Sequence, residues 1–276
     1  MRHGMVPLKA IMLSAAVMLL ISSCATLSGN GVGRVKRYTI ESEEVPAQFD
    51  GFKVAFLSDL HYPSLFSESR LSKLVACLNR EEPDILLLGG DYVTDNDSVG
   101  ALFDALRTVE TRFRTCAVWG NHERNNKDLV AQAMQRNGVL LLEDSVFVIA
   151  DEGASMYVVG INDSFSFDSL DADPCKALPQ DAFVMMLAHT PDYAERSSTT
   201  ADLVLSGHTH GGQVNLFGLY APVKNSIYGN RFLSGINETA DGAVVITTNG
   251  VGTSRKKVRF CVPSELVIVT LERNIP

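Results

Sequence analysis

The chain has 276 residues, of which 46% are hydrophobic and 20% are charged, and its formal net charge is −8. This length suits one large α/β domain or two small ones, and the composition is that of a globular protein with a substantial core. The acidic balance excludes nucleic acid as an expected partner, because binding to a phosphate backbone requires basic surface. The net charge does not exclude a small anionic substrate, since bound metal ions can reverse the local charge.

The beginning of the chain has the features of an export signal. Basic residues precede an apolar run from Ala10 to Ile21, which is shorter than a membrane span of about 20 residues but suits a signal peptide. The run ends in Ile21-Ser22-Ser23-Cys24, which resembles a bacterial lipoprotein box with Cys24 as the lipidated residue. We therefore predict a signal peptide or uncleaved membrane anchor at 1–23 and a flexible tether at 24–35. The expected protein is exported and attached to a membrane as a lipoprotein.

A single folded domain is predicted for residues 36–276, and its first half has an alternating β-α pattern. An edge strand is expected at 37–40. Continuous apolar runs predict buried strands at 52–58, 84–88 and 115–119. Apolar residues at helical spacing predict helices at 67–80, 99–109 and 128–137.

Beyond residue 138 the chain is richer in strands. Runs at 139–142, 145–150 and 155–161 are separated by short turns, which predicts an antiparallel part of a sheet. Residues 163–179 are polar and irregular and should form a surface excursion with one short helix. Further strands are predicted at 183–187, 202–205, 243–248 and 265–271.

The remaining cysteines show neither a CxxC pair nor a compact spacing. They are Cys77, Cys116, Cys175 and Cys261. We interpret them as buried reduced thiols, while a disulfide between two of them stays open for an exported protein.

The histidines gather at the ends of predicted strands. Of six histidines in the chain, one lies near the N-terminus and the others are His61, His122, His189, His208 and His210. Ligands of open α/β sheets bind at the carboxyl ends of strands, and imidazole with carboxylate is a ligand set for first-row transition metals. Seven candidate ligands follow the strands: Asp59, His61, Asp91, Asn121, His189, His208 and His210. Seven exceed the need of one ion, so the sequence predicts two ions that share a bridging carboxylate.

These residues form sequence blocks that resemble the signature of the calcineurin-like metallophosphoesterases. The blocks are Asp59-x-His61, Gly90-Asp91, Gly120-Asn121-His122-Glu123, His189 and Gly207-His208-x-His210, in the family's order within about residues 52–272. The resemblance implies an α/β fold, a two-sheet β-sandwich flanked by helices in four α/β/β/α layers. Residues 259–268 are most similar to the membrane-associated bacterial branch, which is itself similar to phosphodiesterases and the UDP-diacylglucosamine pyrophosphatase.

The family pattern also implies a role for each residue. Asp59, His61 and His210 would hold the first metal ion, and Asn121, His189 and His208 the second. Asp91 would bridge the two ions. His122 would be an acid beside the site and Glu123 its orienting partner. The mixed nitrogen and oxygen ligands suit Mn, Fe or Zn.

The implied function is hydrolysis of phosphodiester or pyrophosphate bonds by a metal-activated hydroxide. The substrate would be a phosphoester. It could be linked to a lipid or a nucleotide and be hydrolysed at the membrane. A broad phosphomonoesterase or protein phosphatase is the alternative, and a non-catalytic, lipid-tethered metal-binding protein is a third. The runs 62–66 and 216–220 are either an apolar wall for a lipid or ordinary loop packing. The basic residues of 255–259 either steer an anion or are surface charge.

Overall fold

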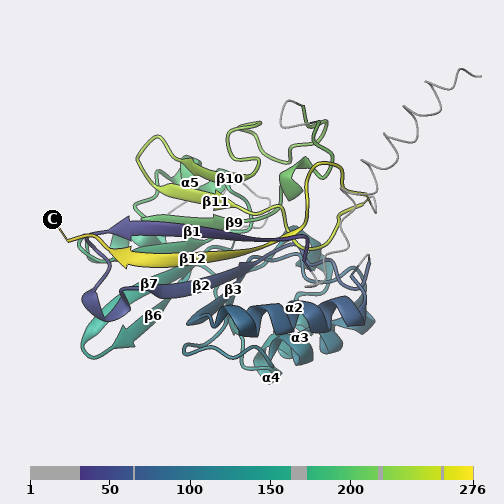
Figure 1. Cartoon of the computed structure of the whole chain (residues 1–276), viewed down its shortest axis with the longest axis horizontal. Coiled ribbons are helices and arrows are strands. Elements are labelled where there is room, and N and C mark those ends of the chain that lie inside the picture. The colour runs from purple at the N-terminus through teal and green to yellow at the C-terminus, as the bar shows by residue number, and fades with distance from the viewer. Residues whose placement is uncertain (1–31, 65, 163–172, 217–219, 256–257, 276) are drawn as a thin grey trace, which may run out of the picture.

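The computed structural model describes residues 32–64, 66–162, 173–216, 220–255 and 258–275. Within these ranges, two six-stranded mixed sheets pack face to face, with helices on their outer faces (Figure 1). This architecture is the predicted two-sheet β-sandwich flanked by helices. It brings the carboxyl ends of strands from both sheets to the same end of the molecule.

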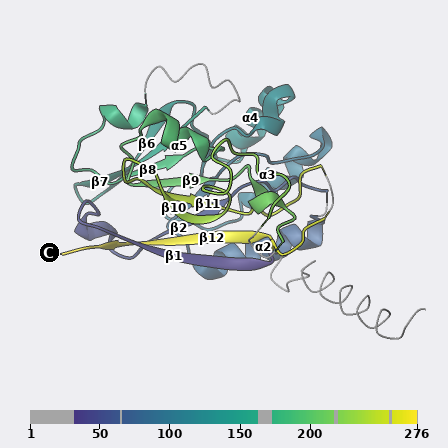
Figure 2. The same cartoon turned by 90° about the horizontal axis from the view of Figure 1, so that it is seen from above.

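The first sheet has the strand order β1 (Arg34–Ser42), β12 (Glu265–Arg273), β2 (Phe52–Leu57), β3 (Ile85–Leu88), β4 (Cys116–Ala117) and β5 (Leu140–Leu141). β1 is the predicted edge strand, although it begins slightly before the expected start of the domain at Lys36. It pairs in parallel with β12, and Figure 2 shows these two strands side by side along one edge of the molecule. β12 is antiparallel to β2, and the strands from β2 to β5 are parallel to one another.

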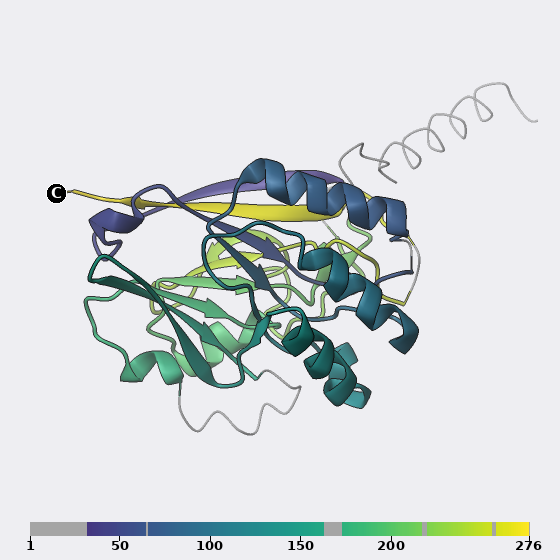
Figure 3. The ribbon, with the colours of Figure 1, turned by 90° about the horizontal axis from the view of Figure 1, so that it is seen from below.

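Three helices connect the parallel strands of the first sheet, as the sequence predicts. They are α2 (Glu68–Glu81), α3 (Val99–Leu106) and α4 (Lys127–Arg136), drawn blue to teal in Figure 3. α2 shows why such a helix forms where it does. The Ser67 side chain accepts a hydrogen bond from the Arg70 N–H at its start, and Leu71, Leu74 and Leu78 on one face are buried.

The second sheet has the strand order β10 (Gly235–Glu238), β11 (Val244–Thr247), β9 (Leu203–Ser206), β8 (Val184–Leu187), β7 (Ala154–Gly160) and β6 (Ser145–Asp151). Its two edge pairs are antiparallel and its central pairs are parallel. α5 (Asp192–Ser197) connects β8 to β9. Short 3₁₀ segments complete the described elements at Ala47–Phe49, Asn96–Ser98, Asn121–Asn125, Pro174–Ala177 and His210–Gly212.

The predicted antiparallel pairing of residues 139–142 with the strands that follow them was wrong. The antiparallel pairing predicted beyond residue 138 holds for β6 and β7, but β5 belongs to the other sheet and lies parallel to β4. Helix α4 lies between β4 and β5 in sequence and serves as the crossover that a parallel pair requires. The short polar strand β10 was missed, because Gly-Ile-Asn-Glu carries little apolar signal.

Three hydrophobic cores hold the layers together. The first packs α2, α3 and α4 on the outer face of the first sheet. The second fills the space between the sheets, with Phe56, Leu87, Leu187 and Leu205 among its members. The third packs α5 and nearby loops on the outer face of the second sheet. The central core determines how the two sheets face each other.

The predicted signal or anchor at 1–23 and most of the tether at 24–35 lie outside the described residues. Within the described residues, no helix combines the length and apolar character needed to cross a membrane. Cys77, Cys116 and Cys175 are buried free thiols, in agreement with the interpretation from sequence, whereas Cys261 is only partly buried.

Replacing Phe56 tests the importance of the central core. Phe56 is fully buried between the sheets, so Phe56→Ala should lower the free energy of unfolding by about 3–5 kcal/mol. Urea unfolding measures this loss. The exposed Val148 of β6 is the control, and Val148→Ala should change stability by no more than about 0.5 kcal/mol. Similar losses in both variants would contradict this account of the core.

Candidate functional site

Seven side chains converge where strands of the two sheets end. From the first sheet, Asp59 and His61 follow β2, Asp91 follows β3 and Asn121 follows β4. From the second sheet, His189 follows β8, and His208 and His210 follow β9. The structure thus brings all seven predicted ligands into one site, in two groups that have Asp91 in common.

The first group contains Asp59, His61, Asp91 and His210, whose candidate ligand atoms lie within 4.8 Å of one another. The Nε2 atoms of His61 and His210 are 3.2 Å apart, and their rings are stacked. His210 Nε2 is 3.2 Å from Asp59 Oδ1, and His61 Nε2 is 3.5 Å from Asp91 Oδ2. The ring nitrogens and carboxylate oxygens therefore point toward a common centre.

The second group contains Asp91, His189 and His208, joined by the side chain of Asn121. Asn121 Oδ1 lies 3.1 Å from both His189 Nε2 and His208 Nδ1. His189 Nε2 is 3.2 Å from His208 Nδ1 and 3.6 Å from Asp91 Oδ2. The second group therefore lies next to the first, and a ring nitrogen from each group approaches the same Asp91 oxygen, Oδ2.

The chemistry of these atoms fits divalent metal ions. Asp59 Oδ1 is buried, and the nitrogen near it, His210 Nε2 at 3.2 Å, makes no hydrogen bond of regular geometry to it. Nitrogen and oxygen lone pairs that converge in a buried space repel one another unless a cation lies between them. Mixed imidazole, carboxylate and amide ligands are the set that Mn, Fe and Zn accept. Both groups could therefore hold a metal ion.

The backbone is strained at many of these residues. Positive φ angles occur at Asp59 (55°), His61 (44°), Asp91 (57°), His208 (65°) and His210 (52°). A non-glycine residue in this conformation costs about 1–3 kcal/mol and persists where surrounding contacts impose it. Here the N–H groups of Asp59 and His61 donate to the carbonyls of Gly90 and Asp91, at 2.9 and 3.0 Å. The fold thus holds the ligands in positions that the chain does not favour locally.

Glycines allow the site loops to approach one another closely. A Cβ atom on Gly207 would lie 2.1 Å from Ser58 Oγ and 2.3 Å from Asp59 Oδ2. A Cβ atom on Gly120 would lie 2.3 Å from the Asp91 backbone nitrogen. Any larger residue at either position would push the ligand-bearing loops apart.

Hydrogen bonds outside the two groups orient the ligands. His189 Nδ1 donates to the Gly89 carbonyl at 2.7 Å, which leaves Nε2 to face the second group. Asp59 Oδ2 accepts from Ser58 Oγ at 2.7 Å and from the His208 N–H at 2.9 Å, which leaves Oδ1 to face the first group. Each of these bonds selects the atom that points into the site.

Glu123 has a different set of contacts from the one expected. Its carboxylate is fully buried and accepts from the backbone N–H groups of Gly120, Asp91 and Tyr92, each at 2.9 Å. No hydrogen bond joins it to the His122 ring among the described residues. Burial, with a smaller effect of Asp91, raises the pKa of Glu123 to about 7. Glu123 therefore positions the backbone that carries Asp91 and Asn121 rather than the His122 side chain.

His122 lies beside the first group, outside both clusters. Its ring centroid is 4.7 Å from that of His61, and its Nε2 atom is 3.9 Å from Asp91 Oδ2. Its side chain is 37% exposed, whereas those of His61 and His189 are fully buried. The backbone N–H of His122 donates to Asp91 Oδ1 at 2.9 Å. The exposed ring is thus accessible from solvent at the edge of the site.

Burial and neighbouring charges divide the histidines into two classes. Burial lowers the pKa of His61 to about 4, and burial together with His189 lowers that of His208 to about 4. Burial also acts to lower the pKa of His189, but the adjacent Asp91 carboxylate outweighs it and raises the value to about 10. Despite the cost of burial, the charge of His189 keeps the pKa of Asp91 below its usual range. Without bound metal, His189 and Asp91 form a buried ion pair.

Arg259 is a supporting residue whose role sequence reasoning missed. Its guanidinium donates to the carbonyls of Asn249, Gly250 and Gly252, at distances of 2.5–3.1 Å. One of its nitrogens lies 3.4 Å from His210 Nδ1. Arg259 therefore holds the loop behind His210, and neither interpretation of the basic residues at 255–259, anion steering or surface charge, describes its contacts. Nothing in the sequence of the basic residues at 255–259 distinguishes a buried structural arginine from an exposed one.

The two apolar runs near the site differ from each other. Tyr62 and Phe66 are buried and pack edge to face, which is ordinary loop packing. Leu216 and Tyr220 are exposed by 44% and 60%.

Comparison with known proteins identifies the family. Residues 52–212 match the family model described as calcineurin-like phosphoesterase. The chain belongs to the calcineurin-like phosphoesterase family. That matched range contains both groups of candidate ligands.

Bacterial relatives extend over most of the chain. The phosphodiesterase YaeI of Escherichia coli (strain K12) is 34% identical over 215 residues, which cover 73% of this chain and 76% of that protein. The uncharacterized metallophosphoesterase YkuE of Bacillus subtilis (strain 168) is 28% identical, over 85% and 84%. An uncharacterized metallophosphoesterase of Aquifex aeolicus (strain VF5) is 30% identical, over 87% and 92%. Among solved structures, TT1561 of Thermus thermophilus has a TM-score of 0.48 at 13% identity, over 72% of this chain and 90% of that one.

Metal binding should displace a proton from His189. Near pH 6, His189 with its pKa of about 10 is protonated, while His61 and His208 with pKa values of about 4 are neutral. A ligating imidazole must be neutral, so binding should release the proton of His189, and affinity should rise with pH toward about 10. Calorimetry in buffers of different ionisation enthalpy counts the protons released. His189→Asn is the control and should release about one proton fewer than the wild type. No proton release by the wild type would contradict the buried ion pair.

Proposed function

We propose that the protein hydrolyses phosphodiester bonds, with the scissile phosphate placed between the two groups of ligands. The observation that carries this proposal is the Asp91 carboxylate, which both groups share. Divalent ions bound there would activate a water molecule near neutral pH and offset charge on the phosphoryl oxygens. The buried, hydrogen-bonded side chains fix the position of both groups before the substrate arrives.

The assignment of ligands follows from the two groups. In this proposal Asp59, His61 and His210 hold one ion, and Asn121, His189 and His208 hold the other. Asp91 bridges them. The ions would be Mn, Fe or Zn, as the mixed nitrogen and oxygen ligands suit all three.

One observation favours a diester over a monoester, namely the similarity to the E. coli phosphodiesterase. The guanidinium of Arg259 is bonded to backbone carbonyls, so it adds little direct recognition of phosphate in either case. A pyrophosphate with a substituent on each phosphorus would bind in a similar manner.

Activity on paired chromogenic substrates tests the reaction class. With Mn²⁺ added, the protein should hydrolyse bis-p-nitrophenyl phosphate with a kcat/KM at least about tenfold above that for p-nitrophenyl phosphate, and chelation should abolish both activities. The reverse preference would indicate a phosphomonoesterase. Metal binding without hydrolysis of either substrate would indicate the non-catalytic alternative.

His122 is proposed to protonate the leaving oxygen. Its ring lies beside the first group yet outside both sets of ligands, so it can exchange protons without disturbing the metal ions. His122→Ala should keep the full metal content and lose about a hundredfold or more of kcat on the diester. Metal analysis and steady-state kinetics measure the two properties. Full activity at normal metal content would exclude this role, and loss of one metal equivalent would make His122 a ligand instead.

A further inference from the structure

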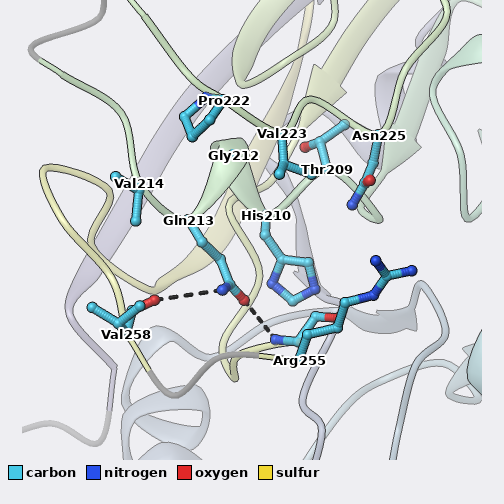
Figure 4. A pocket seen from close by; sticks show the side chains of 11 residues that line it. Thr209, His210, Gly212, Gln213, Val214, Pro222, Val223, Asn225, Arg255 and Val258 are labelled. Atoms are coloured by element: carbon cyan, nitrogen blue, oxygen red, sulfur yellow. Dashed lines mark hydrogen bonds between the residues drawn. The ribbon is translucent and has the colours of Figure 1, made fainter.

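A pocket of about 190 Å³ lies beside His210, between loops of the second half of the chain (Figure 4). His210 contributes to its wall, while the Nε2 atom of the same ring faces the first group of ligands. The pocket therefore borders the site without including the other ligands. A group attached to a phosphate at the site could enter it.

Most of the exposed surface of this pocket is apolar, although polar side chains such as Gln213 and Asn225 also line it. Val214, Val223 and Val258 supply apolar surface, and Val223 and Val258 are 53% and 45% exposed. Figure 4 shows the Arg255 guanidinium extending toward the side where Asn225 lies. A short aliphatic group would remove the valine surfaces from water, which is favourable in proportion to the apolar area covered.

The shape of the pocket is imposed by the fold. Four of its non-glycine residues have positive φ angles: His210 (52°), Gln213 (53°), Asn225 (49°) and Arg255 (46°). The Gln213 side chain ties two walls together, because its Oε1 accepts from the Ser254 N–H and its Nε2 donates to the Val258 carbonyl. Strained backbone held by cross-loop hydrogen bonds marks a built cavity rather than a gap between loops.

A second, larger pocket of about 520 Å³ lies beside His208, and its lining includes the ionisable side chains of Asp192 and Lys224. Lys224 and Thr190 line it, and Pro222 and Asn225 belong to both pockets and so form the wall between them. Asn225 Nδ2 donates to the His208 carbonyl at 3.5 Å.

Asp192 holds the loop that carries this wall. The buried Asp192 carboxylate accepts from Ser226 Oγ at 2.5 Å and from the Ile227 N–H at 2.9 Å. Each pocket consequently has a fixed position beside a different group of ligands.

We propose that the pocket beside His210 binds a short aliphatic ester group of the substrate, and that the pocket beside His208 binds its larger, polar ester group. This inference rests on the proposed function, because a phosphate between the two groups would present one substituent to each pocket. The substrate class is then an asymmetric, amphiphilic phosphodiester.

A series of alkyl p-nitrophenyl phosphates tests this assignment, because the leaving group stays constant while the alkyl group grows from methyl to hexyl. With the full-length, metal-loaded protein, kcat/KM should rise roughly threefold to fourfold per added methylene until the pocket is full. A flat dependence on chain length would overturn the proposal.

Substitutions in the wall of the pocket beside His210 test whether the dependence of kcat/KM on chain length arises there. Val258→Trp should fill it, and Val223→Asp should make it polar, so either change should bring the hexyl-to-methyl ratio of kcat/KM to within about twofold of one. Val148→Trp on β6 is the control, because Val148 is 48% exposed and lines none of the pockets described here. It should keep the wild-type ratio. A ratio unchanged in both wall variants would overturn the proposal.

Binding measurements separate this inference from the proposed function. Calorimetry of the metal-loaded protein with monoalkyl phosphates, methyl to hexyl, should show affinity rising with chain length and the rise lost in Val258→Trp. That result without hydrolysis of any diester would support the pocket and reject the phosphodiesterase. Diester hydrolysis without chain-length dependence in either measurement would reject the pocket and keep the phosphodiesterase.

Discussion

The candidate site depends on hydrogen bonds that cross from one sheet to the other. The Asp59 carboxylate, which follows β2, accepts from the backbone of His208, which follows β9. In the opposite direction, the His189 ring after β8 donates to the Gly89 carbonyl after β3. The two bonds are 2.9 and 2.7 Å long, and the second is buried, where the low local dielectric strengthens it. They fix the separation of the two groups of ligands. The geometry of the site therefore depends directly on how the two sheets pack.

Holding the ligands in these positions costs conformational free energy in the loops that carry them. Most of the candidate ligands have left-handed backbone, and glycines are required where their loops touch. The three hydrophobic cores offset this cost by fixing the strands, and the loops follow from the strand ends. Glu123 adds to the same effect from inside the site, because one carboxylate joins the loops that carry Asp91 and Asn121. Of the thirteen non-glycine residues with positive φ in the described part of the chain, five are candidate metal ligands.

The electrostatics of the site match its proposed use. Carboxylates and neutral imidazoles converge in a buried space within a chain of net charge −8. In the metal-free protein the protonated His189 supplies the compensating positive charge beside Asp91. Divalent ions would replace that proton and make the local charge positive, as the binding of an anionic phosphoester requires. Membership of the calcineurin-like phosphoesterase family agrees with this chemistry, and the two flanking pockets bear on which phosphoester binds.

The sequence by itself determined the elements that carry the site. Apolar runs ending in Asp, Asn or His predicted β2, β3, β4, β8 and β9, because burial and periodicity are local properties of the chain. The layered fold was implied by the resemblance of the sequence blocks to the calcineurin-like metallophosphoesterases. The partner of a strand is not local. Only the tertiary structure decided that β5 joins the first sheet, that Glu123 bonds backbone rather than His122, and that Arg259 braces the loop behind His210. These contacts depend on how strands and loops from different parts of the chain assemble, which no short stretch of sequence specifies.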